Sequence, residues 1–183
     1  MRRRSLLLAP LILLLGAAGA QAGPAARDRR AIQALVEYQA RALDFSVALA
    51  LAVAHAESNF DPLALSPKGA RGVMQIMPAT ARSEYGIEPQ LLWDPRVNVR
   101  LGIHFLRRLV ASYGGRTDRA LAHYNGGTAA AAVPLARTYP ETRDYVRRVL
   151  RLEGGYRQAS GGVTAWTPPT HGLRFSGPAS ARH

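Results

Sequence analysis

Glu57 is the residue of this sequence best placed to do acid chemistry. It ends an apolar run, Val47–Ala56, and leads into a stretch rich in Gly, Pro, Ser, Gln and Met that extends to Ala81. Burial raises the pKa of a carboxyl group, and so does the negative end of a helix dipole. A carboxyl that keeps its proton near neutral pH can donate it to a leaving group. Glu57 is therefore a candidate general acid, and the alternative reading is a solvated Glu at a helix end.

Four short motifs, the first of which contains Glu57, occur in order along residues 44–150. The first consists of Glu57-Ser-Asn-Phe-Asp-Pro and Ser66-Pro-Lys-Gly-Ala-Arg-Gly-Val-Met-Gln-Ile-Met-Pro-Ala-Thr-Ala81. The others are Asn98-x-x-x-Gly102-x-x-Phe-Leu106, His123-Tyr124-Asn125-Gly126-Gly127 and Glu141-Thr-Arg-Asp-Tyr145-Val. Together they resemble the catalytic domain of the soluble lytic transglycosylase (SLT) family. The resemblance implies an all-α, mainly helical, lysozyme-like fold.

The resemblance also implies a reaction. In lytic transglycosylases a single Glu protonates the bond between N-acetylmuramic acid and N-acetylglucosamine in peptidoglycan. The resulting carboxylate then accepts the proton of the muramic acid 6-hydroxyl while that oxygen closes onto C1. The product carries a 1,6-anhydro ring and no water is consumed, and the N-acetyl group is thought to replace a second carboxylate. By this resemblance the chain is a lyase, with Glu57 as both acid and base.

Six further residues match positions of the family's substrate site: Ser66, Gln75, Met77, Tyr124, Asn125 and Tyr145. The resemblance implies that Tyr145 lies close to Glu57 and helps hold it, and that Ser66 hydrogen-bonds near the reacting sugar or Glu57. It implies that the other four line the cleft. Most have a structural alternative, because Ser-Pro pairs start turns and Met or Tyr residues often belong to cores. Gln75 resists that reading, since a polar residue inside an apolar run needs a reason.

The third motif departs from the family pattern. His123 and Gly126 stand where the family usually has Ala, and residues 128–133 replace a customary Pro-Gly turn. These changes leave Glu57 untouched. They bear on product-side binding and on the preference among glycans.

Ordinary glycosidases use two carboxylates, and the sequence offers Glu57 no obvious partner. Asp61 and Asp94 each precede a proline, where a turn or a helix cap explains them. Either of them at about 6.5–9.5 Å from Glu57 would favour a goose-type-lysozyme-like muramidase, which is a hydrolase. A peptidoglycan-binding scaffold without activity is the alternative of another class. Neither a metal nor a cofactor is expected, because cysteine and the His-Glu-x-x-His pattern are absent from the sequence.

The N-terminal residues indicate export. Residues 1–22 read as a secretory signal peptide, with a basic start at Arg2–Arg4, an apolar stretch at Leu6–Leu15 and a small-residue cleavage site at Ala20-Gln-Ala22. The apolar stretch is short for a bilayer span. We therefore expect a periplasmic monomer without a stable membrane span once the signal is cleaved.

The net charge of the chain indicates which classes of binding partner to expect. Without the signal peptide, 21 basic and 12 acidic residues remain, a net charge of +9. That charge suits the anionic cell wall and its glycan strands. Nucleic acid is not expected as a partner, because no recognised nucleic-acid motif accompanies the basic residues. The short length favours an accessory enzyme that opens the wall for a secretion or conjugation apparatus.

Helices must position these side chains, because the apolar residues recur at helical spacing. The sequence predicts a catalytic domain over 23–153, followed by a flexible tail over 154–183. Within the domain, Asp44 is expected to cap the helix that carries Glu57, and the helix that starts at Asp94-Pro95 is expected to be the longest. The loop after Glu57 has room for a small hairpin near 66–75. The predicted helices cover residues 28–42, 45–57, 78–85, 95–113, 117–124, 128–137 and 140–152.

Overall fold

The computed structural model describes residues 24–161. The signal peptide predicted over 1–22, and the predicted tail beyond residue 161, lie outside the described residues. Within them the chain is helical and contains no strand, so the all-α prediction is confirmed. The elements are α1 (Pro24–Ala42), α2 (Val47–Ser58), α3 (Pro78–Tyr85), η1 (Pro89–Trp93), α4 (Pro95–Ser112), α5 (Thr117–Ala132), η2 (Leu135–Arg137) and α6 (Pro140–Ala159).

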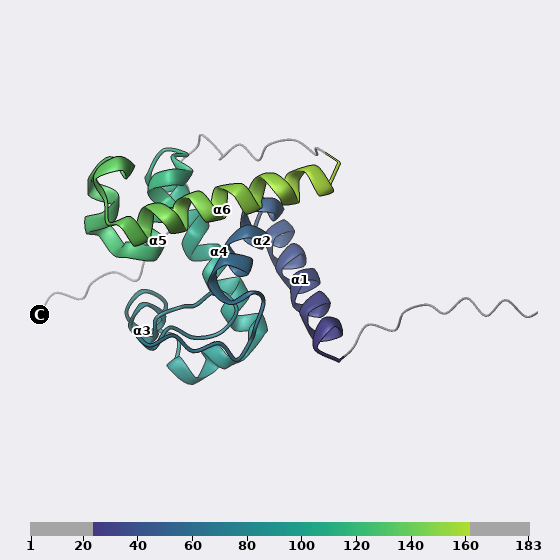
Figure 1. Cartoon of the computed structure of the whole chain (residues 1–183). Helices are drawn as coiled ribbons and strands as arrows, with labels where there is room; N and C mark the ends of the chain where they lie inside the picture. The colour runs from purple at the N-terminus through teal and green to yellow at the C-terminus, as the bar shows by residue number, and fades with distance from the viewer. Residues whose placement is uncertain (1–23, 162–183) are drawn as a thin grey trace, which may run out of the picture.

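Helix α2 lies at the centre of the fold, between α1 and α6 (Figure 1). Its six residues from Leu49 to Ala54 are all buried. A helix that is apolar on every side can be stable in water only when other elements surround it. Helix α4 packs on both α1 and α5, and α5 packs on α6. The two helices that flank α2 are therefore held by further helices. The consequence for the site is a rigid base for Glu57, in the last turn of α2.

The start of α2 differs from the prediction. Ser46, and not Asp44, caps the helix, because its side chain accepts a hydrogen bond from the Leu49 N–H at 3.2 Å. Asp44 adopts a left-handed φ of 47° and belongs to the turn that ends α1. The N–H of Phe45 bonds back to the Ala40 carbonyl at 2.9 Å, which closes that turn. Two candidate caps two residues apart cannot be ranked from the sequence, since the choice depends on where the first helix ends.

The last helix is longer than predicted. Helix α6 continues through Gly154 and Gly155 to Ala159, so the first residues assigned to the flexible tail are helical. Tyr156 explains the extension, because its hydroxyl lies 2.9 Å from His55 Nδ1 and so ties α6 to α2. At 20 residues α6 is also longer than α4, which has 18. Tertiary packing outweighs the low helix propensity of two glycines.

The loop after α2 is held by a buried amide. Asn98 on α4 accepts from the Met74 N–H at 2.8 Å and donates to the carbonyls of Arg71 and Leu92 at 2.8 and 3.0 Å. A Cβ on Gly72 would lie 2.6 Å from Asn98 Nδ2, and one on Gly102 would lie 2.5 Å from Met74 Cβ. The second sequence motif, Asn98 and Gly102, is therefore the device that clamps this loop onto α4.

The small hairpin expected in this loop takes a reduced form. Two isolated antiparallel bridges, Leu65 with Arg71 and Arg71 with Ile76, replace a pair of strands. The N–H of Ser66 bonds to the Ala70 carbonyl at 3.0 Å. The segment is too short and too rich in turns for a ladder to extend.

Helix α5 bends at the third motif. Gly127, with φ 75° and ψ −174°, separates two helical halves, which approximates the two helices predicted over 117–124 and 128–137. Gly126 lies where α5 meets α6. A Cβ there would lie 2.6 Å from Ala130 Cβ and 2.9 Å from Thr142 Oγ1. The packing of α5 on α6 thus leaves no room for a side chain at position 126.

Candidate active site

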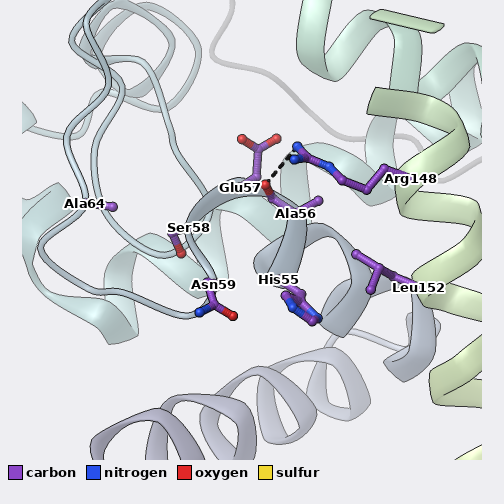
Figure 2. Close-up of a pocket in the computed structure, with 8 residues that line it drawn as sticks. All are labelled: His55, Ala56, Glu57, Ser58, Asn59, Ala64, Arg148 and Leu152. Carbon is purple, nitrogen blue, oxygen red and sulfur yellow. Dashed lines mark hydrogen bonds between the residues drawn. The ribbon is translucent and has the colours of Figure 1, made fainter. Parts of the chain in front are cut away.

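Glu57 lines a pocket of about 670 Å³ between the end of α2, the following loop and α6. We call it the Glu57 pocket and define it by its lining residues (Figure 2): His55, Ala56, Glu57, Ser58, Asn59, Ala64, Arg148 and Leu152. Of these described lining residues, Glu57 alone carries a carboxyl group. The pocket thus presents one carboxyl group, one guanidinium, one imidazole, and the polar side chains of Ser58 and Asn59.

Two left-handed residues bring Glu57 to the edge of the pocket. Asn59 and Phe60 have φ values of 55° and 68°, so the chain reverses immediately after the helix. Phe60 tolerates this backbone because its ring is buried, 5.5 Å from the ring centre of His55 and 5.3 Å from the Arg29 guanidinium. The strain of a left-handed aromatic residue is offset by this packing. The reversal leaves the Glu57 carboxyl at the helix end, facing the pocket.

Tyr145 holds the carboxyl of Glu57. Its hydroxyl donates a hydrogen bond of 2.6 Å to Glu57 Oε1 from α6, and the ring is buried. Burial raises the pKa of Glu57 to about 7, while the Tyr145 hydrogen bond and the nearby Arg148 charge oppose that rise. Near neutral pH the carboxyl is therefore divided between its two protonation forms. Such a group can donate a proton and take one back.

Tyr124 holds the loop that follows α2. Its hydroxyl donates to the Met74 carbonyl at 2.8 Å, and its ring lies 5.5 Å from that of Phe105. Burial raises the pKa of Tyr124, and the charge of Glu57 adds to the effect. Tyr124 thus stays protonated and links α5 to the loop that Asn98 holds from α4.

Ser66 and Gln75 bond to the loop backbone. Ser66 Oγ accepts from the Ala70 N–H at 2.9 Å, as a turn-forming serine does. Gln75, with a left-handed φ of 47°, donates from Nε2 to the carbonyls of Ala64 and Gly72 at 3.1 and 2.9 Å. Ser58 adds a bond of 2.8 Å from its Oγ to the Val73 carbonyl. These side chains fix the shape of the loop, including Ala64 in the pocket wall.

Two of the predicted residues lie at the surface. Met77, at the start of α3, and Asn125, in α5, are both exposed and outside the Glu57 pocket. The structure therefore brings Glu57 and Tyr145 into direct contact. Tyr124, Ser66 and Gln75 support the loop through bonds to its backbone. Met77 and Asn125 remain accessible to ligands at the surface.

Sequence reasoning did not identify Arg148, Asn59 and Leu152 as pocket residues. Arg148 lies three positions after Tyr145, and residues three apart share one face of a helix. That spacing is a signal that places Arg148 beside Tyr145 once Tyr145 is assigned to the site. Leu152 continues the same face by one further turn. Asn59 gave no such signal, because its place depends on the reversal of the chain after α2.

Asp61 and Asp94, the two candidates for a second carboxylate, both have local structural contacts. Asp61 Oδ1 accepts from the Leu63 N–H at 2.9 Å, and Asp94 Oδ1 accepts from the Arg96 N–H at 2.8 Å as the cap of α4. Neither lines the Glu57 pocket. In the part of the chain that the structure describes, no group of three His, Cys, Asp or Glu residues is arranged to hold a metal ion.

The chain is similar in sequence and in structure to lytic murein transglycosylases. Residues 34–145 match the family described as Transglycosylase SLT domain. The soluble lytic murein transglycosylase of Salmonella typhimurium is 34% identical over an alignment of 143 residues, and the match covers 66% of this chain and 22% of that protein. The membrane-bound lytic murein transglycosylase F of Vibrio vulnificus is 39% identical over an alignment of 90 residues, and the match covers 46% of this chain and 16% of that protein.

A solved structure of similar fold is the lytic transglycosylase Slt of Pseudomonas aeruginosa, determined as an inactive glutamate-to-glutamine mutant. It superposes with a TM-score of 0.64 at 29% identity, covering 72% of this chain and 25% of that one. The chain described here thus spans about a quarter or less of the length of these relatives.

Proposed function

Because the chain belongs to the transglycosylase SLT domain family, we propose that it is a peptidoglycan lytic transglycosylase. It cleaves the β-1,4 bond between N-acetylmuramic acid and N-acetylglucosamine, and it leaves a 1,6-anhydro ring on the muramic acid. The observation that carries the proposal is the Glu57 pocket, where a carboxyl with a pKa of about 7 is held by Tyr145 and no second acid lines the wall among the described residues.

The reaction needs one proton to travel in both directions. Glu57, protonated, donates its proton to the glycosidic oxygen as the bond from muramic C1 to that oxygen breaks, and the bonding electrons leave with the oxygen. The Glu57 carboxylate then accepts the proton of the muramic 6-hydroxyl while O6 bonds to C1. Atoms balance without water. Tyr145 stabilises the carboxylate that exists between the two steps, since a hydroxyl bond favours the charged form.

The remaining residues of the site have supporting roles in this proposal. Tyr124, Ser66 and Gln75 shape the loop that faces Glu57, as their bonds to backbone atoms support. Met77, which immediately precedes α3, and Asn125 on α5 are exposed and contact the glycan strand outside the Glu57 pocket. No metal or cofactor takes part.

The deciding experiment is mass spectrometry of the fragments released from purified sacculi by the chain without residues 1–22. We expect products that end in 1,6-anhydro-muramic acid, and none from Glu57→Gln. Reducing ends, heavier by one water, would make the protein a muramidase. Release of nothing, with binding to sacculi retained, would make it a scaffold. Circular dichroism of Glu57→Gln serves as the control that the variant is folded.

The cellular setting follows from the same proposal. The substrate lies outside the cytoplasmic membrane, so the protein acts in the periplasm. We also propose that it acts as a monomer and that the signal peptide over 1–22 is removed. Among the described residues, no helix is long and apolar enough to cross a bilayer. We retain a role beside a secretion or conjugation apparatus as a proposal, to be tested by whether deletion of the gene impairs assembly of such machinery.

A further inference from the structure

Arg148 extends from α6 over the Glu57 pocket and is fixed there by two contacts. Its Nη2 donates to the Ala56 carbonyl at 3.0 Å (Figure 2). Its guanidinium also lies 5.9 Å from the centre of the Tyr145 ring. The side chain is nevertheless exposed. A long side chain on a protein surface usually samples several rotamers, and holding it in one reduces the entropy lost on binding a ligand. The guanidinium is thus positioned in advance, in a pocket open to solvent.

Arg148 also supplies the positive charge of the pocket. His55 is the other basic residue among the described lining residues, and burial lowers its pKa, with Arg29 and Arg148 adding to the effect. The imidazole is therefore neutral at neutral pH. A guanidinium carries five N–H donors in one plane, a geometry that fits a carboxylate. The Ala56 carbonyl uses one nitrogen, which leaves the planar fork able to bind an anion from the solvent side.

The chemistry of the proposed substrate limits what that anion can be. The sugar rings of peptidoglycan are N-acetylated and carry no charge, so its carboxylates lie on the lactyl–peptide arm attached to muramic acid. Leu152, Ser58 and Asn59 add an apolar side chain, a hydroxyl and an amide to the same pocket, which suit a short peptide better than a sugar ring. Resting on the proposed function, we infer that Arg148 binds a carboxylate of the peptide stem on the muramic acid whose bond Glu57 cleaves.

The test compares glycan strands that differ only in the charge of the stem. One set keeps its stem carboxylates and a second set has them amidated, and kcat/KM is measured on both for the wild type, Arg148→Gln and Arg148→Lys. We expect the wild type to prefer the charged strands by about tenfold, the size of one charge-assisted hydrogen bond. Arg148→Gln loses that preference and Arg148→Lys keeps part of it. The ratio cancels any effect of Arg148 on Glu57 itself, because that effect is common to both substrates.

Arg151→Gln is the matched control, since Arg151 is exposed, lies one turn further along α6 and does not line the pocket. It should keep the wild-type ratio. A second pair of substrates, strands stripped of their stems with the lactyl carboxylate free or amidated, separates the two sources of charge. If the wild type preferred the charged form only in this second pair, Arg148 would bind the lactyl carboxylate. The inference that it binds a carboxylate of the peptide stem would then be wrong.

The alternative is that Arg148 only caps the carboxyl end of α2 through Ala56. Arg148→Gln would then lower the melting temperature and reduce kcat/KM equally on charged and amidated strands, and the inference would be wrong. If the wild type forms no anhydro product on any strand, the proposed function fails separately. Calorimetry of wild type and Arg148→Gln with a soluble disaccharide-peptide, charged or amidated, then decides the inference by binding alone.

Discussion

Glu57 is the residue at which function and stability conflict. Its pKa of about 7 in the folded protein lies above the 4.5 of an exposed Glu, mainly because of burial. The folded state therefore binds a proton more tightly than the unfolded state. This contribution to stability is fully present below pH 4.5 and is lost as the pH rises through 7. At neutral pH the partly ionised, buried carboxyl of Glu57 lowers the stability of the fold, and the same burial keeps part of it protonated as a proton donor.

Replacing Glu57 by Gln should therefore stabilise the protein in a pH-dependent way. We expect little difference from the wild type at pH 4 and a gain of about 2–3 kcal/mol at pH 8, because the neutral amide avoids burial of a charge. Urea unfolding of both proteins at the two pH values measures it, and other titrating groups cancel in the difference. If Glu57→Gln changed the free energy of unfolding equally at both pH values, the pKa of the Glu57 carboxyl would not be raised in the folded protein.

Tyr145 tunes the same carboxyl from the opposite direction. Its hydrogen bond of 2.6 Å lowers the pKa of Glu57 against the effect of burial. In Tyr145→Phe we expect kcat to fall about 10- to 100-fold, since a hydrogen bond to a charged group is lost. The high-pH limb of the rate profile should move to higher pH, because the pKa rises further. Tyr38→Phe, at an exposed site on α1, is the control. A lower kcat with an unmoved limb would contradict direct tuning.

At the scale of elements, the contact between α5 and α6 depends on Gly126. Tyr124 on α5 holds the loop through the Met74 carbonyl, and Tyr145 on α6 holds the carboxyl of Glu57. The packing of the two helices therefore connects these two supports. A side chain at position 126 would collide with Ala130 and Thr142. The backbone at position 126 therefore lies too close to α6 for a side chain to fit beside Thr142 of the closing motif.

Gly126→Ala should destabilise the protein by about 1–3 kcal/mol, as overpacking of a tight contact does. The matched control is Gly154→Ala in α6, where an added Cβ meets no atom within 4 Å. That change should stabilise by about 0.5–1 kcal/mol, because Ala is the better helix former. Thermal unfolding of both variants decides it. Equal shifts of the two melting temperatures would show that close packing at position 126 is unimportant.

At the scale of the molecule, net charge governs how the protein reaches its substrate. The full chain carries +12, and +9 remains without residues 1–22. If the substrate is an anionic wall, association is assisted by long-range attraction that salt screens. Binding to sacculi should weaken at least about tenfold between roughly 0.05 and 0.3 M salt, measured by sedimentation. Cleavage of a short, uncharged fragment should change little. Salt-independent binding to sacculi would contradict this expectation.

Local features of the sequence determined the helical class, the position of Glu57 at a helix end and the order of the four motifs. Helical spacing, Pro at the first turn and Gly after the last turn act over a few residues, so they can be read directly. The cap of α2 was misassigned and α6 was predicted too short, because each depends on a distant partner: the end of α1 for Ser46, and His55 for Tyr156.

Only the tertiary structure decided what surrounds Glu57. Its hydrogen bond to Tyr145 joins residues 88 positions apart, and the bond from Arg148 to Ala56 spans 92. Resemblance to a family suggested the first of these contacts. Helical spacing places Arg148 on the same face as Tyr145, but it does not indicate the bond to Ala56. The structure also showed that Asn98 and Gly102 clamp a loop and that Ser66 and Gln75 bond to its backbone. The pKa of a carboxyl depends on everything within a few ångströms of it, and local sequence patterns do not encode those distances.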